Sequence, residues 1–474
     1  EMADYKINMS KEKVKMPEQD PNIRNKNFKE VTLGYTLEMA QKEATRCLQC
    51  KNAPCMSGCP VSVHIPEFIN YLVAGNLENA YDAISFTNNL PAICGRVCPQ
   101  EVQCEGVCTR GIKSEPVAIG RLERFIADWY MNNSYNKPVE VTSQNAKVAV
   151  IGAGPSGLSA AADLAKMGYQ VVLFEAFHAA GGVLMYGIPE FRLPKELVQK
   201  ELKNVIGLGV KLQTNTIVGR TISLNDLFDQ GFESIYISTG AGLPSFLGID
   251  GENLNGVYSA NEFLTRINLM KAYKFPEYDT PVHIGKKVCI VGGGNVAMDA
   301  ARSAKRLGAD VTVVYRRSFD EMPARIEESH HAMEEGVNFM NLHNPVEILG
   351  NDGWVNAVKL EKMNLGQADN SGRRRPIPTG EYEEVKFDSV IVSIGQSPNP
   401  LIKQTNNDIK TEDWGGIIVN KDSTMTSKDG VFAGGDAVSG AATVILAMGA
   451  GKKAAINIDK YIKEKRNKVK EELN

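Results

Sequence analysis

Eight cysteines crowd into one short stretch of this chain, and their spacing is its strongest chemical signal. The chain has 474 residues and nine cysteines, of which eight lie between Cys47 and Cys108. They form two groups of four: Cys47, Cys50, Cys55 and Cys59, then Cys94, Cys98, Cys104 and Cys108. Clustered thiols without an export signal favour metal binding over disulfides. We therefore expect a metal-binding region in a protein of the reducing cytoplasm.

Two kinds of metal site compete for these thiols. Zinc ribbons use two CxxC pairs a dozen or more residues apart. Here four thiols lie within 13 residues and end in Cys59-Pro60, and a second Cys-Pro pair occurs at Cys98. This pattern resembles the ferredoxin run, whose last cysteine reaches across to a second cluster. The spacing favours two [4Fe–4S] clusters over zinc or unliganded thiols, since thiolates suit iron–sulfur chemistry.

A dinucleotide-binding fingerprint follows the cysteine region. The apolar run Val148 to Ile151 leads into Gly152-Ala-Gly154-Pro155-Ser156-Gly157, then a helix-forming stretch and a second apolar run that ends in Glu175. The first glycine permits a tight turn, the second admits a pyrophosphate, and the third lets helix and strand pack closely. The helix N-terminus binds the phosphates, and Glu175 can accept hydrogen bonds from a ribose. The full pattern predicts an FAD site rather than a turn without a ligand.

A second unit carries the GxGxxA variant of the same fingerprint. Its motif residues are Gly292, Gly294, Asn295 and Val296. The strand Val311 to Tyr315 then ends in Arg316-Arg317, where the first unit has Glu175. An acid at this place suits a free ribose, whereas an arginine suits a 2′-phosphate. We expect this unit to prefer NADPH over NADH; the alternative is an exposed basic pair at a strand end.

Further residues around the first unit are candidates for the FAD site. Gly182 lies in a glycine-rich segment, Gly181 to Pro194, that reads as a long loop. A strand at Ser389 to Ile394 is expected to return to the first unit, and Asp436 is a candidate partner for a ribityl hydroxyl. A helix from Val444 can direct its N-terminal dipole at a reduced flavin. The other candidates are Thr239, Gly240, Gly395, Gly435 and Thr443.

The order of the expected helices and strands predicts an α/β fold. A helical domain comes first in the sequence, and two Rossmann-like units follow it. Thr36 to Cys47 reads as a capped helix, Ile65 to Thr87 as two short helices, and the first 30 or so residues as an extended arm or a solvated tail. The expected domains are 1–145 (iron–sulfur), 146–245 with 386–474 (FAD) and 246–385 (NADPH), with a linker at Ser134 to Gln144.

Other features carry weaker expectations. His330 and His331 are adjacent on a predicted helix and cannot share a face, so we expect surface histidines. Residues 341–385 read as a β-meander whose loop, Arg373 to Arg375, is a solvated turn or a docking point. A net charge of −3 gives no case for nucleic acid, and no apolar run is long enough to span a membrane.

The motifs GAGPSG, GGGNVA, TGA and AGGD occur in order, so the last two thirds of the chain resembles glutathione- and thioredoxin-reductase-like flavoproteins. Those enzymes place a redox CxxC beside the flavin, and this chain has none after Cys108. With its cysteine region, the whole chain resembles the small subunit of bacterial NADPH-dependent glutamate synthase and the amino-terminal part of dihydropyrimidine dehydrogenase. On KEKVKMPEQ, GYTLEMAQKEATRCLQC and HIPEFI it is most similar to the large subunit of the electron-bifurcating NADH-dependent reduced ferredoxin:NADP⁺ oxidoreductase.

The resemblance implies a ligand set for each of two [4Fe–4S] clusters. In dihydropyrimidine dehydrogenase a glutamine replaces one cysteine ligand, and Glu123 stands at the matching position here. The cysteine that matches Cys94 is not a ligand there. One cluster is then held by Cys47, Cys50, Cys55 and Cys108, and the other by Cys59, Cys98, Cys104 and Glu123. The alternative for Glu123 is a surface helix carboxylate.

The resemblance also implies an enzyme that moves electrons between NADP(H), FAD and the clusters. The bifurcating likeness predicts a second flavoprotein subunit and ferredoxin as partners. The first alternative is the glutamate synthase small subunit, which passes electrons to a large FMN subunit. Two further alternatives are an electron relay with a degenerate NADPH site, which Arg316 and Arg317 disfavour, and a zinc-stapled binding module fused to a reductase.

Overall fold

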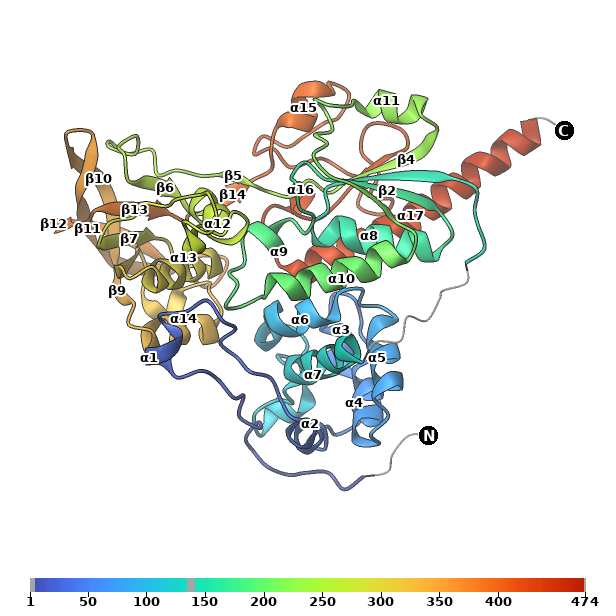
Figure 1. Ribbon diagram of the computed structural model, residues 1–474, viewed down its shortest axis with the longest axis horizontal. Helices are drawn as coiled ribbons and strands as arrows, with labels where there is room; N and C mark the ends of the chain where they lie inside the picture. The colour runs from blue at the N-terminus through green and yellow to red at the C-terminus, as the bar shows by residue number, and fades with distance from the viewer. Residues whose placement is uncertain (1–4, 134–140, 473–474) are drawn as a thin grey trace.

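The computed structural model describes residues 5–133 and 141–472 and shows a helical part below two parallel sheets (Figure 1). The predicted helix after Thr36 is confirmed as α2, because Thr36 Oγ1 accepts a hydrogen bond from the Met39 amide at 3.3 Å. Two helices, α4 and α5, separate the cysteine groups as expected. The helices here are α2 (Leu37–Ala44), α3 (Pro54–Ser57), α4 (Ile65–Val73), α5 (Leu77–Ser85), α6 (Pro91–Val97), η1 (Gln100–Val102), η2 (Thr109–Ile112) and α7 (Ile119–Asn132).

The first fingerprint lies in a five-stranded parallel sheet of order β15-β4-β1-β2-β3. Helix α8 follows β1 and packs against α10 and the long carboxy-terminal helix α17 on one face of the sheet (Figure 1). Because all five strands are parallel, the carboxyl ends of β1, β4 and β15 meet at one edge. The elements are β1 (Lys147–Ile151), α8 (Pro155–Lys166), β2 (Gln170–Phe174), α10 (Lys195–Gly207), β3 (Lys211–Gln213), β4 (Phe232–Ile237), β15 (Val431–Ala433) and α17 (Val444–Glu472).

The second fingerprint lies in another five-stranded parallel sheet, of order β6-β13-β7-β8-β9. The expected meander is confirmed as the antiparallel strands β10, β11 and β12. The elements are β6 (Val257–Ser259), α12 (Ala260–Asn268), β7 (Lys287–Val291), α13 (Asn295–Arg306), β8 (Asp310–Tyr315), α14 (Ile326–Glu334), β9 (Asn338–Asn341), β10 (His343–Asn351), β11 (Trp354–Ala368), β12 (Arg374–Lys386) and β13 (Ser389–Val392).

Two expectations about individual segments are wrong. The strand at Ser389 to Ile394 does not return to the first unit, because β13 pairs with β7 and β6 in the second sheet. Its run of buried apolar residues suits the centre of any parallel sheet, so the pattern alone could not identify its neighbours. The chain crosses back afterwards, where β14 (Gln396–Ser397) pairs with the outgoing β5 (Leu243–Pro244). The segment Gly181 to Pro194 is also not all loop, since it contains α9 (Val183–Tyr186).

The amino-terminal arm is bound to the second unit. From residue 5 it runs without long helices to the short helix α1 (Pro21–Arg24), which lies beside α14 (Figure 1). The Arg24 side chain is 1% exposed, so the described part of the arm is not a solvated tail. Residues 1–4, and 134–140 of the expected linker, lie outside the described residues. No helix among those described is both long and apolar enough to cross a membrane.

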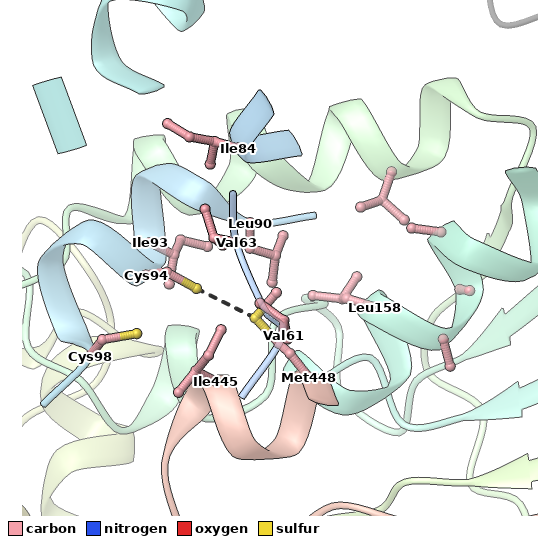
Figure 2. Packing of buried hydrophobic residues seen from close by; sticks show 14 of the residues in the cluster. Val61, Val63, Ile84, Leu90, Ile93, Cys94, Cys98, Leu158, Ile445 and Met448 are labelled. Atoms are coloured by element: carbon pink, nitrogen blue, oxygen red, sulfur yellow. Dashed lines mark hydrogen bonds between the residues drawn. The ribbon is translucent and has the colours of Figure 1, made fainter. Parts of the chain in front are cut away.

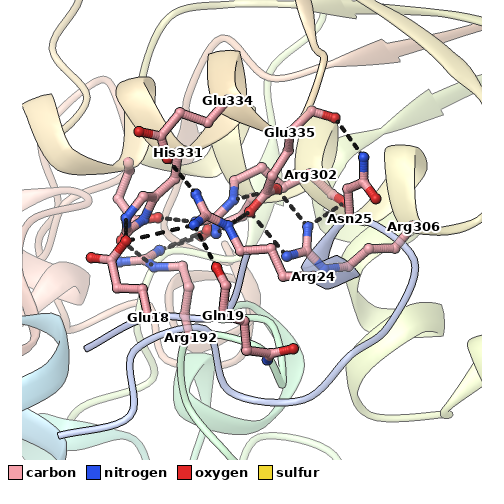
Figure 3. Close-up of polar contacts among 12 residues, drawn as sticks. Glu18, Gln19, Arg24, Asn25, Arg192, Arg302, Arg306, His331, Glu334 and Glu335 are labelled. Carbon is pink, nitrogen blue, oxygen red and sulfur yellow. Dashed lines mark hydrogen bonds and ion pairs between the residues drawn. The ribbon is translucent and has the colours of Figure 1, made fainter. Parts of the chain in front are cut away.

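Buried ion pairs fasten the arm to helices α13 and α14. The Glu335 carboxylate accepts hydrogen bonds from Arg24 Nε at 2.9 Å, Arg302 Nη2 at 2.8 Å and Arg306 Nη1 at 2.7 Å (Figure 3). The arm also covers His331, which is 6% exposed and lies 3.3 Å from the Glu18 carboxylate. The expectation of a surface histidine therefore holds for His330 but is wrong for His331, since helical spacing does not reveal a covering segment.

Candidate functional site

The turn between β1 and α8 has the shape that a dinucleotide requires. Gly152 has φ +97°, and a Cβ there would lie 2.4 Å from the Ser238 carbonyl oxygen. A Cβ on Gly157 would lie 1.9 Å from the Gly152 carbonyl oxygen, so helix and strand pack too closely for any side chain. A Cβ on Gly154 would meet only Gly182 Cα, at 3.9 Å. The space beside the N-terminus of α8 is thus open to a pyrophosphate, as the fingerprint predicts.

Glu175 lies against this turn at the end of β2. Its carboxylate accepts hydrogen bonds from the Ala153 amide at 3.0 Å and the Phe177 amide at 2.9 Å. Burial raises the pKa of Glu175, and these two amides oppose the rise. An ionised carboxylate retains acceptor capacity beyond two hydrogen bonds, so Glu175 can also receive ribose hydroxyls.

Asp436 supplies the clearest test of whether a flavin fits. It opens the short helix α16 (Asp436–Ser439) after β15, and its Oδ1 is buried without a hydrogen-bond partner in the described structure. Burial also raises its pKa to about 6. A buried carboxylate oxygen that accepts no hydrogen bond lowers the stability of the fold. A bound ligand that donates a hydrogen bond to this oxygen removes that cost. Asp436 therefore fits a group with hydroxyl donors, such as the ribityl chain of FAD.

Other predicted residues gather at the same edge. Gly435 has φ +66°, and a Cβ there would lie 2.9 Å from Ser156 Cβ, so the β15 turn closes onto α8. Thr443 caps α17, because its Oγ1 accepts a hydrogen bond from the Leu446 amide at 3.3 Å. Thr239 and Gly240 follow β4 after one intervening residue, Ser238, and β4 pairs with β1. Gly395 instead lies at the crossing between the units, where its carbonyl accepts from Ser245 at 3.0 Å.

The second fingerprint has the same construction. Gly292 has φ +134°, and a Cβ there would lie 2.1 Å from the Ser393 carbonyl oxygen, whereas Gly294 has open space around it. Asn295 begins α13, and its Oδ1 accepts a hydrogen bond from the Arg325 amide at 2.9 Å. Val296 is 41% exposed at the same helix end. The N-terminus of α13 is therefore accessible to a nucleotide.

The two arginines after β8 occupy different environments. Arg316 is exposed, and its side chain forms no ion pair or hydrogen bond with the described residues. Arg317 is 8% exposed, and its Nε donates to the Arg374 carbonyl at 2.8 Å. Its Nη2 also lies 3.8 Å from Asp369. The structure thus leaves Arg316 open to a phosphate and ties Arg317 to the hairpin between β11 and β12, whose approach the sequence did not indicate.

Four of the cysteines, all half-buried, line one apolar pocket: Cys47, Cys50, Cys55 and Cys108. The rest of its wall includes Ile65, Ile69 and Val117. Burial and the neighbouring thiols raise the pKa of Cys47 to about 11 and that of Cys55 to about 12. Thiols that suppress each other's ionisation need a cation to hold them together as thiolates. The pocket fits an iron–sulfur cluster.

The second set of candidate ligands comprises Cys59, Cys98, Cys104 and Glu123, and the charge of Glu123 affects all three cysteines. Burial first, and then Glu123 and Cys94, raise the pKa of Cys59 to about 11. A hydrogen bond with the Cys94 side chain and burial chiefly raise the pKa of Cys98, and Glu123 adds to that rise. Burial and Glu105 chiefly raise the pKa of Cys104, to which Glu123 also contributes. Glu123 is only 8% exposed, and burial raises its pKa to about 8. The surface-carboxylate alternative is therefore wrong, and the charge of buried Glu123 acts on three candidate ligand cysteines.

Cys94 lies within an apolar cluster (Figure 2). Its side chain is 1% exposed, and its Sγ lies 3.5 Å from the Met448 Sδ. Asn88 stands between Cys94 and Glu123: its Oδ1 is 3.6 Å from the Cys94 Sγ, and its Nδ2 donates to Glu123 at 2.7 Å. Glu123 thus has a defined hydrogen-bond partner, and Cys94 lies close to Ile445, Met448 and Leu90 (Figure 2) while its side chain also hydrogen-bonds with Cys98.

Helix α17 connects the FAD edge with the second cysteine set. Its N-terminus starts one residue after Thr443, and Met448 reaches Cys94 on its next turn. A Cβ on Gly449 would lie 3.1 Å from the carbonyl oxygen of Pro60, the neighbour of Cys59. A Cβ on Gly451 would lie 2.2 Å from the Ser156 carbonyl oxygen. Glycine at these two positions of the helix therefore allows it to pack between the two domains.

Comparison with known proteins agrees with this division of the chain. Residues 24–135 match the family model "dihydropyrimidine dehydrogenase domain II, 4Fe-4S cluster", and residues 146–451 match "pyridine nucleotide-disulphide oxidoreductase". The FprA protein of Mycobacterium tuberculosis, solved in complex with NADPH, has a TM-score of 0.58 at 19% identity, covering 68% of this chain and 86% of FprA. At that identity the likeness shows the fold of the two nucleotide units.

Relatives extend the match to the whole chain. The glutamate synthase [NADPH] small chain of Azospirillum brasilense is 36% identical, with 95% of each chain covered. The NADP(+)-dependent formate dehydrogenase subunit beta of Moorella thermoacetica is 38% identical over 87% of this chain but only 60% of its own length. The 4Fe-4S match favours iron–sulfur chemistry over the zinc alternative. The chain belongs to the glutamate synthase small-chain family of NADPH-dependent oxidoreductases, which carry FAD and [4Fe–4S] clusters.

Proposed function

We propose that this chain is the electron-input subunit of a glutamate synthase-type complex, which oxidises NADPH and passes electrons to a larger partner subunit. The proposal rests mainly on the position of α17. This helix approaches Ser156 at the FAD edge, and it also approaches Pro60 and Cys94 in the cysteine region. The relatives favour this function over the bifurcating one that the sequence motifs suggested, because glutamate synthase small chains match along nearly their whole length.

The residues of the chain have separate tasks in this proposal. The α13 N-terminus and Arg316 bind NADPH, and the α8 N-terminus, Glu175 and Asp436 hold FAD. Bound FAD supplies the conversion between two-electron and one-electron transfer. The buried and half-buried thiol groups hold the clusters beside apolar side chains. Since α17 packs directly on Pro60, we expect the second cysteine set to lie nearer the FAD than the first.

Purification from the native host under anaerobic conditions tests the partner. We expect a very large flavoprotein to co-elute and the complex to form glutamate at the expense of NADPH. Co-elution of a flavoprotein of ferredoxin-reductase size, with ferredoxin reduction but no glutamate formation, would support the electron-bifurcating function instead.

We further propose the ligand sets Cys47, Cys50, Cys55 and Cys108 for one cluster, and Cys59, Cys98, Cys104 and Glu123 for the other. The burial of Glu123, its electrostatic effect on the three cysteines and the contact of Cys94 with Met448 support this division. A carboxylate is a harder ligand than a thiolate, so it should alter the potential and lability of its cluster.

Cys94→Ser and Glu123→Ala form a matched pair that tests the ligand sets. We expect Cys94→Ser to retain the iron of both clusters and Glu123→Ala to lose or perturb one cluster, because only the second change removes a ligand. Iron analysis and electron paramagnetic resonance measure both. Loss of a cluster in Cys94→Ser, with an unchanged spectrum in Glu123→Ala, would restore an all-cysteine assignment.

Arg316→Ala tests the choice of nucleotide. We expect it to raise the Kd for NADPH about tenfold or more and to change the Kd for NADH little, because a charge-assisted contact to the 2′-phosphate is lost. Stopped-flow measurement of flavin reduction against nucleotide concentration gives both values. An equal loss for the two nucleotides would show that Arg316 does not recognise the 2′-phosphate.

A further inference from the structure

The hairpin between β11 and β12 reaches the end of β8, where the second unit has its arginine pair. Arg317 links the end of β8 to the hairpin, because its Nε donates to the Arg374 carbonyl at 2.8 Å and its Nη2 lies 3.8 Å from Asp369. Asp369 also donates its amide to the Arg373 carbonyl at 2.7 Å, which closes the hairpin tip. The hairpin is thus anchored at the place where an adenosine ribose would lie in a Rossmann-like unit.

The side chain of Arg374 is held in one position at this anchor. Its Nε donates to Glu321 Oε1 at 2.7 Å, and its amide donates to the same oxygen at 3.0 Å. Its Nη2 lies 3.5 Å from Ser318 Oγ, two residues after Arg316. Burial alone would raise the pKa of Glu321, but the hydrogen bonds from Arg374 and Ser318 lower it to about 2. A charged Glu321 therefore orients Arg374, whose side chain is still 49% exposed.

Residues 315–324, which include Arg316 and Glu321, pack against the glycine-rich turn of the second unit. The Tyr315 hydroxyl donates to the Glu321 carbonyl at 3.0 Å, and a Cβ on Gly293 would lie 2.7 Å from the Tyr315 ring. Ala324 donates its amide to the Gly293 carbonyl at 3.1 Å. Residues 315–324 are therefore fixed to the turn that receives the nucleotide, and they carry both Arg316 and the carboxylate that orients Arg374.

We propose that Arg374 is a second specificity-determining residue for the 2′-phosphate of NADP(H), supplied by the hairpin beside Arg316. A phosphate monoester carries nearly two negative charges and accepts several hydrogen bonds, so it gains from two guanidinium groups. Arg374 keeps free N–H donors on a planar group whose orientation Glu321 already holds, which lowers the entropy lost on binding. This inference rests on the proposed NADP(H) site of the second unit.

Isothermal titration calorimetry with 2′,5′-ADP and 5′-ADP tests the role of Arg374 on the purified holoprotein, without any turnover. We expect Arg374→Ala to raise the Kd of 2′,5′-ADP about tenfold, or about 1.4 kcal/mol, and to leave that of 5′-ADP within about twofold. Arg374→Lys should recover part of the loss. Arg375→Ala is the matched control, because Arg375 is an exposed neighbour, and it should change neither Kd by more than about twofold.

The outcomes separate this inference from the proposed function. An unchanged Kd for 2′,5′-ADP in Arg374→Ala, or an equal loss for both nucleotides, would overturn the role of Arg374. If Arg316→Ala loses 2′,5′-ADP binding while Arg374→Ala keeps it, the NADP(H) site stands and only this inference fails. If the unaltered protein binds 2′,5′-ADP no better than 5′-ADP, the NADP(H) preference itself is wrong.

Discussion

Gly154→Val should abolish FAD binding while leaving the protein folded. A Cβ at this position would meet only Gly182 Cα, at 3.9 Å, so the protein itself has room for a side chain. The valine would occupy the space beside the α8 N-terminus through which a pyrophosphate must approach. The measurement is the flavin absorbance of the purified variant, with its thermal unfolding followed by circular dichroism.

Gly157→Ala provides a contrasting control. Its Cβ would lie 1.9 Å from the Gly152 carbonyl oxygen, so this change should disturb the turn itself and lower the stability as well as the flavin content. If Gly154→Val kept a full complement of flavin, the first unit would not be the FAD site.

Glu335→Ala should destabilise the protein by about 3–5 kcal/mol, because it leaves buried guanidinium groups without their counter-charge. The Glu335 side chain is fully buried and pairs with Arg24, Arg302 and Arg306 (Figure 3). Glu334→Ala is the matched control, since Glu334 is 51% exposed and, among the described residues, forms an ion pair only with Arg24. Its removal should cost about 1 kcal/mol or less. Denaturant unfolding of both variants measures the difference, and equal effects would refute the role of the buried network.

The same carboxylate makes stability depend on pH. Its contacts with Arg302 and Arg306 hold the folded-state pKa of Glu335 well below its usual range, although burial opposes this. The stabilisation is therefore fully present above the unfolded-state pKa of about 4.3 and is lost as the pH falls from there toward the folded-state value. Unaltered protein should lose stability steeply below about pH 4, and Glu335→Ala should lose less over that interval.

The local chemistry of the site was predictable because each motif is contiguous in the sequence. The turn after β1 needs glycine at residues 152 and 157 for steric reasons that hold in any Rossmann-like unit, so the pattern alone indicates the geometry. The cysteine spacing likewise indicated clusters. Glu123 could be proposed only through the family resemblance, since nothing in its own helix distinguishes a buried carboxylate from an exposed one.

The remaining features depend on contacts between distant segments. Arg317 meets Arg374 across 57 residues, and Arg24 meets Glu335 across 311. A short basic segment has the same local appearance whether it is solvated or packed, so neither the arm nor the hairpin could be placed from its composition. The strand β13 illustrates the same limit, because its apolar run fits the centre of either sheet.

An anaerobic titration of the purified holoprotein with NADPH tests most directly whether electrons pass from the nucleotide through FAD to the clusters. Visible absorption reports the flavin, electron paramagnetic resonance reports the clusters, and dithionite gives the fully reduced reference. We expect NADPH to bleach the flavin and to produce a reduced [4Fe–4S] signal, with NADH much less effective. A flavin that NADPH reduces fully, beside clusters that stay oxidised until dithionite is added, would contradict transfer from FAD to the clusters.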